Sequence, residues 1–111
     1  MELTYRKKKL ERQCTDPKEA NKALGAEQAK RLRQRVDDLL AAPSLAEFRQ
    51  LPGRCHELTA DRAGQLSLDL NGPYRLILVP AASPPPTMPS GGLDWSAVTA
   101  VEVIEITDTH E

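Results

Sequence analysis

The spacing of apolar residues changes at Pro52-Gly53, and this change constrains the fold more than any other feature of the sequence. Before it, apolar residues recur at the spacing of a helix face. After it, they alternate with polar residues, as in strands that bury one face. The chain has 111 residues, which is the usual size of one domain. We therefore expect a single α+β domain over residues 1–111, with a helical region at about 8–50 and a sheet region at about 54–107.

The helical region carries clear start and stop signals. Leu3 and Tyr5 alternate with polar neighbours, which favours a short strand before it. The run Asp16-Pro17-Lys18-Glu19 is typical of a helix start, because Asp caps, Pro suits the first helical position and Glu completes a capping box. Helices are expected at residues 8–14, from 16 to about 25, at about 26–42, and for one turn after Ser44.

The helix at about 26–42 has two distinct faces. Apolar residues at helical spacing predict its buried side, which consists of Ala29, Leu32, Val36, Leu39 and Leu40. The other face is basic and carries Lys30, Arg31, Arg33 and Arg35. Such a face is usually solvated, but it also suits phosphate or an acidic partner.

The sheet region centres on a hairpin. Asn71-Gly72 is a strong two-residue turn signal, so strands at about 66–70 and 74–79 should pair antiparallel. The segment 80–92 holds five of the nine prolines and two of the six glycines, which predicts an exposed loop. Alternation at 99–107 predicts a last strand on the sheet.

Charge and hydropathy exclude several classes of protein. The longest apolar run is about four residues, far below the ~20 of a membrane span. The basic N-terminus lacks the apolar stretch of a secretory signal, so we expect a cytoplasmic protein without membrane contact.

The two halves of the chain differ in charge. Residues 1–62 hold 14 Lys and Arg against 10 Asp and Glu, whereas residues 63–111 hold one Arg against six acids. The basic half is therefore the half that suits an anionic partner.

Cys14 and Cys55 are the only cysteines, and neither belongs to a CxxC or Cys/His cluster. The sequence therefore offers neither a disulfide framework nor a metal site, and we expect buried or idle thiols, no metal and no cofactor.

The chain has two histidines, His56 and His110. Histidine is the side chain best suited to moving protons near neutral pH, and a pair can serve as base and acid. The alternative is that both are ordinary surface residues.

Arginines accompany the first histidine. Arg54 and His56 stand two apart and would share one face of a strand. Arg75 lies within an otherwise apolar strand, where it needs an anion or a partner. That partner is either a ligand or a structural carboxylate, Asp69 or Asp108.

Three stretches together resemble the HigB branch of the RelE/ParE toxin superfamily. They are LPGRCHEL at 51–58, GQLSLDLNGPYRL at 64–76, and the terminal Asp108-Thr109-His110. The resemblance implies N-terminal helices packed on a curved antiparallel sheet of about four to five strands. It also implies a toxin of a type II toxin–antitoxin module, a metal-independent endoribonuclease that cuts messenger RNA on the ribosome and inhibits translation. The implied partners are messenger RNA, the ribosome and a cognate HigA-like, DNA-binding antitoxin.

The resemblance assigns catalytic residues by position, namely His56, Arg75, Asp108 and His110. An RNA 2′-hydroxyl can attack the adjacent phosphorus, so the protein must remove one proton, supply another and stabilise negative charge. His56 or His110 would be base or acid, and Arg75 would hold the phosphate oxygens. Asp108 would orient an imidazole or raise its pKa.

Four further basic residues are candidates for substrate binding. Arg54 and Arg62 would bind neighbouring phosphates. Lys30 and Arg33 would meet ribosomal RNA or an acidic antitoxin.

The sequence departs from the family pattern at two site positions and in one insertion. Thr59 stands where the family often has lysine, Thr109 where it has tyrosine, and a Pro-rich insertion occupies 81–92. Two alternatives therefore remain. One is a catalytically weak or inert protein of this fold that binds an antitoxin-like partner in a killer-suppression role, and the other is a ParE-like gyrase inhibitor.

Overall fold

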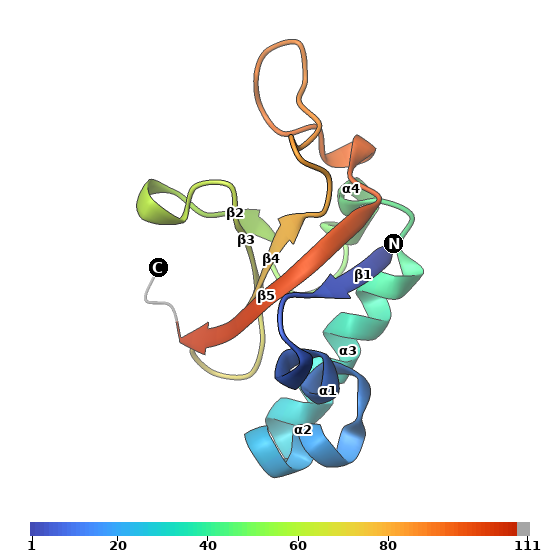
Figure 1. Ribbon diagram of the computed structural model, residues 1–111, viewed down its shortest axis with the longest axis vertical. Helices are drawn as coiled ribbons and strands as arrows, with labels where there is room; N and C mark the ends of the chain where they lie inside the picture. The colour runs from blue at the N-terminus through green and yellow to red at the C-terminus, as the bar shows by residue number, and fades with distance from the viewer. Residues whose placement is uncertain (109–111) are drawn as a thin grey trace.

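A five-stranded open sheet forms the centre of the protein (Figure 1). The computed structural model describes residues 1–108. The strands lie in the order β1-β5-β4-β3-β2. Their bounds are β1 (Glu2–Tyr5), β2 (His56–Glu57), β3 (Leu66–Asp69), β4 (Tyr74–Pro80) and β5 (Ala100–Asp108). The expected α+β class with four to five strands is confirmed.

One strand pair corrects the expectation of an antiparallel sheet. The pairs β2–β3, β3–β4 and β4–β5 are antiparallel, but β1 runs parallel to β5. Parallel neighbours need a long connection, and here most of the chain separates the two strands. The sheet is therefore mixed. Local alternation in the sequence predicts a strand, but it does not reveal a partner strand that lies so far away in the chain.

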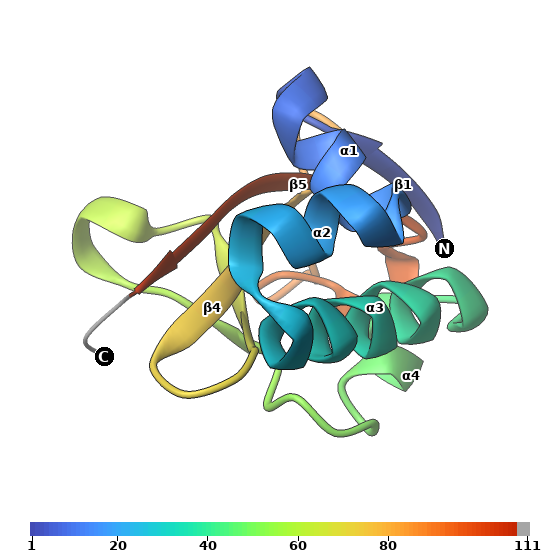
Figure 2. The same cartoon turned by 90° about the horizontal axis from the view of Figure 1, so that it is seen from below.

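The helices form a layer on one side of this sheet (Figure 2). They are α1 (Lys8–Thr15), α2 (Pro17–Leu24), α3 (Ala26–Ala41) and α4 (Leu45–Phe48). The predicted cap is present, because the Asp16 carboxylate accepts a hydrogen bond from the Lys18 amide at 3.0 Å. These bounds agree with the predicted helices to within one or two residues.

The core lies between α3, α4 and the inner face of the sheet. Its fully buried side chains include Leu32, Leu39, Leu45, Phe48, Leu66, Leu68, Leu76, Leu78, Val101 and Val103. The predicted stripe on α3 is wrong at Leu40, which is 54% exposed. Leu39 and Leu40 are adjacent on the helix, and only Leu39 can point into the core.

The hairpin between β3 and β4 differs from the predicted two-residue turn. Leu70 N donates to Tyr74 O at 3.0 Å, so three residues, 71–73, form the connection. Pro73 has no N–H to offer a two-residue turn, and Gly72 takes the left-handed conformation with φ +62°.

The segment between β4 and β5 is largely exposed, as predicted, and it begins at residue 81 because Pro80 still belongs to β4. Its end is fixed by Trp95 in the 3-10 turn Trp95–Ala97. The Arg49 guanidinium lies 3.9 Å from the centroid of the Trp95 ring, and Trp95 Nε1 donates to Glu57 Oε2 at 3.3 Å.

Within residues 1–108, no helix is long and apolar enough to cross a membrane.

Both thiols should be unreactive in the folded protein. Burial raises the pKa of Cys55 from 9.0 to about 12 and that of Cys14 likewise to about 12. At about pH 8 the thiolate fraction is therefore about 1000-fold below that of an ordinary cysteine. We expect negligible alkylation by iodoacetamide in native buffer and rapid modification of both cysteines in urea, measured by mass spectrometry. Rapid labelling of the native protein would contradict the burial.

Candidate functional site

The face of the sheet that points away from the helices carries a row of residues from four strands. His56 of β2 is opposite Ser67 of β3, Ser67 is opposite Ile77 of β4, and Ile77 is opposite Glu105 of β5. Directly paired residues project to the same side, and Leu66 and Leu68 project into the core, so this row lies on the outer face. Ser67 and Ile77 are fully buried, whereas His56 and Glu105 are partly exposed.

The adjacent row on the same face consists of Asp69, Arg75 and Thr107. The register therefore brings His56 and Arg75, which are two of the four predicted catalytic residues, to one face of the sheet. Successive residues of a strand alternate between faces, so His56–Ser67 and Asp69–Arg75 are neighbouring same-side pairs.

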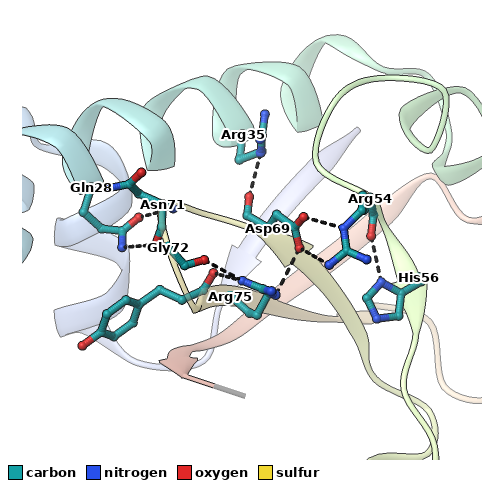
Figure 3. Close-up of polar contacts among 9 residues, drawn as sticks. Gln28, Arg35, Arg54, His56, Asp69, Asn71, Gly72 and Arg75 are labelled. Atoms are coloured by element: carbon teal, nitrogen blue, oxygen red, sulfur yellow. Dashed lines mark hydrogen bonds and ion pairs between the residues drawn. The ribbon is translucent and has the colours of Figure 1, made fainter. Parts of the chain in front are cut away.

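Asp69 connects the arginines of this face (Figure 3). Its carboxylate accepts two hydrogen bonds from Arg54, from Nε at 2.6 Å and from Nη2 at 3.0 Å. Arg75 Nε lies 3.1 Å from the same carboxylate. One of the two structural partners that the sequence left open for Arg75 is thus present. Two guanidinium groups thus approach one carboxylate, and guanidinium groups are donors whose geometry also suits phosphate oxygens.

His56 is joined to this cluster through the backbone of Arg54. The distance from His56 Nδ1 to the Arg54 carbonyl oxygen is 2.8 Å. A carbonyl oxygen only accepts, so Nδ1 carries the proton, and in the neutral ring Nε2 is the basic nitrogen. The interaction therefore makes Nε2 the nitrogen that can act as a general base.

The position of Arg54 corrects the sequence-based argument. Arg54 and His56 do not share a strand, because β2 begins at His56 and Arg54 lies in the preceding loop with φ +49°. Gly53 beside it has φ +125°, and a Cβ there would lie 2.9 Å from Arg35 Nε. The loop thus passes close over Arg35, and the Asp69 amide donates to the Gly53 carbonyl oxygen at 2.8 Å, which holds the loop beside Asp69.

The structure also corrects the basic face predicted for α3. Arg35 is only 6% exposed, and its Nε donates to the Asp69 carbonyl oxygen at 2.8 Å. Gln28, on the same side of the helix, accepts from Asn71 N at 2.8 Å and donates to Asn71 O at 3.1 Å. The inward face of α3 thus includes two polar residues that fix the β3–β4 hairpin, which apolar periodicity does not reveal.

Arg62 reaches the outer face from the connection between β2 and β3. It ends the 3-10 turn Ala60–Arg62, and its Nη1 lies 2.7 Å from Glu105 Oε1 on β5. The same nitrogen donates to Gln65 Oε1 at 2.8 Å. Neither Glu105 nor the central role of Asp69 was identified from the sequence, because both depend on contacts between distant segments.

The remaining predicted site residues are Asp108, His110, Lys30 and Arg33. Asp108 is exposed at the end of β5, opposite Tyr74. His110 lies outside the described residues. Lys30 and Arg33 line a hollow of about 480 Å³ bordered by α1, α2 and α3, whose lining contains none of the outer-face residues. The structure therefore separates these two cations from the His56 and Arg75 cluster. Among residues 1–108, there is no group of three or more side chains suited to holding a metal ion.

Comparison with known proteins identifies the fold. The sequence matches no protein-family model and no curated protein. Among solved structures, it is similar to a YoeB/ParE toxin from Agrobacterium tumefaciens, with a TM-score of 0.61 and 14% sequence identity. The likeness covers 99% of this chain and 100% of that chain. The fold is that of a RelE/ParE-like toxin. At this identity the likeness concerns the fold alone, and the HigB branch stays a prediction.

Proposed function

We propose that this protein is the toxin of a type II toxin–antitoxin module and that it cleaves messenger RNA on the ribosome, in the manner of the HigB branch. The observation that carries the proposal is the connected group of His56, Arg54, Asp69 and Arg75 on the outer face of a toxin fold. This group combines a base of defined tautomer with guanidinium groups that can bind phosphate oxygens, which are two requirements of phosphodiester cleavage.

In the proposed reaction, His56 Nε2 removes the proton of an RNA 2′-hydroxyl. The resulting oxygen attacks the adjacent phosphorus, and the bond from phosphorus to the 5′-oxygen breaks, which leaves a cyclic phosphate. Arg75 holds the phosphate oxygens as negative charge develops, and Arg54 and Arg62 hold neighbouring phosphates. His110 returns a proton to the leaving oxygen, and Asp108 orients the His110 imidazole.

The proposal includes a cytoplasmic location and a cognate HigA-like, DNA-binding antitoxin. Lys30 and Arg33 lie on the helical layer, away from the outer face. In the proposed complex they contact ribosomal RNA or an acidic antitoxin segment, while His56 and Arg75 contact messenger RNA.

Induced expression in a bacterium tests the proposal against its two alternatives. We expect wild-type protein to arrest growth with an early loss of protein synthesis, and Arg75→Gln to relieve the arrest. Arg6→Gln is the matched control, because Arg6 also pairs with a carboxylate, at 2.9 Å from Glu102, but is not a site residue.

Two results would contradict the proposal. A DNA-damage response that precedes the loss of translation would favour a gyrase inhibitor. Normal growth in the presence of soluble, folded wild-type protein would favour an inert protein that only binds a partner.

A further inference from the structure

The contact between Arg62 and Glu105 spans the outer face. Arg62 belongs to the connection between β2 and β3, whereas Glu105 belongs to β5, and β4 lies between them in the sheet. The 2.7 Å separation of Arg62 Nη1 and Glu105 Oε1 therefore requires the arginine to extend over the sheet. Their side chains are 33% and 41% exposed, so a ligand on this face can reach both.

The pair lies in the row that contains the proposed base. His56 stands at one end of this row and Glu105 at the other, with the fully buried Ser67 and Ile77 between them. A single-stranded chain with its reacting phosphate near His56 and Arg75 would cross this row and bring a neighbouring phosphate to Arg62. At that position the phosphate meets an arginine that already has an anionic partner.

A carboxylate and a phosphate present similar oxygen acceptors to a guanidinium group. The carboxylate of Glu105 therefore competes with a phosphate for Arg62, and it also repels the phosphate. An exposed pair of this kind is weak, so the exchange is possible at modest cost.

We propose that Glu105 occupies the place of a substrate phosphate on Arg62 and thereby limits the affinity of the outer face for single-stranded RNA. This inference rests on the RNA-binding part of the proposed function and deepens it. Binding then proceeds by exchange of one carboxylate for one phosphate at Arg62, and Glu105 is the residue that sets its strength.

Equilibrium binding to a short single-stranded RNA with 2′-O-methyl groups, which cannot be cleaved, tests the inference. Glu105→Gln keeps the shape of the side chain and removes its charge. We expect it to bind about two- to fivefold more tightly than wild type at low salt. The slope of log affinity against log salt should also become steeper by up to about one unit, because the carboxylate that wild-type Arg62 releases takes up a cation again, whereas Glu105→Gln has no carboxylate to do so.

Glu102→Gln is the matched control. Glu102 is also a β5 glutamate paired with an arginine, Arg6, at 2.9 Å. It makes the same change in net charge, so a general electrostatic effect would raise the affinity of both variants equally. Equal affinities of the two variants would overturn the inference, as would the absence of any RNA binding at low salt.

A double-mutant experiment shows whether the gain in RNA affinity depends on Arg62. In an Arg62→Gln background, Glu105→Gln should give no more affinity than Glu102→Gln does, and a full gain there would overturn the inference. The proposed function can fail separately. If expression in cells produces no cleavage while the binding differences are found, the cleavage proposal fails and the role of Glu105 stands.

Discussion

Replacing His56 with glutamine should slow messenger RNA cleavage on programmed ribosomes by about 100- to 10,000-fold, the usual contribution of a positioned proton-transfer group. The glutamine amide can still donate to the Arg54 carbonyl oxygen, which His56 Nδ1 approaches at 2.8 Å, so the loop should keep its place. What is lost is the second ring nitrogen, which alone can take the proton of the attacking hydroxyl.

The neighbouring residue of the same strand provides the control for this variant. Glu57 projects to the other face and accepts a hydrogen bond from Trp95 Nε1 at 3.3 Å. Glu57→Gln retains an acceptor there and should cleave at nearly the wild-type rate. The catalytic role of His56 would be refuted if His56→Gln, folded as judged by circular dichroism, cleaved as fast as Glu57→Gln.

Asp69→Ala should lower the free energy of unfolding by about 2 to 3 kcal/mol, because it leaves charged guanidinium groups without their carboxylate. The Arg75 side chain is only 14% exposed and the Asp69 side chain 23%, so water can replace the lost partner only in part. Arg54 also loses both of its hydrogen bonds to the carboxylate, which should loosen the loop before His56.

Urea denaturation measures this loss. Asp37→Asn removes the carboxylate of an exposed pair, in which Arg33 Nε and Asp37 Oδ2 are 3.9 Å apart and both side chains are more than 60% exposed. This control should change stability by less than about 0.5 kcal/mol. A loss for Asp69→Ala no greater than that of Asp37→Asn would show that the carboxylate does not hold the cluster together.

The local features of the fold could be predicted because short-range physics determines them. The cap at Asp16 and the period change at Pro52-Gly53 depend on residues a few positions apart. The resemblance predicted that His56 and Arg75 belong to one site, and the strand register places both on the outer face.

Other features depend on contacts between distant parts of the chain. The carbonyl oxygen of Asp69 meets Arg35, and its carboxylate meets Arg54, across 34 and 15 residues respectively. The parallel pairing of β1 with β5 joins the two ends of the described chain. Arg35 and Gln28 point inward, which simple hydrophobic patterning does not predict. Polar side chains can lie on a buried helix face where they form hydrogen bonds with the backbone, and such partners cannot be identified from the helix sequence alone.

The central claim is that this protein cleaves messenger RNA. It is tested most directly by mapping the 5′ ends of cellular messenger RNA after induced expression. The wild-type protein should create new 5′ ends inside translated reading frames, and His56→Gln and His110→Ala should abolish them. The account would be contradicted if soluble, folded wild-type protein produced no new ends within reading frames, or if the same ends persisted in both variants.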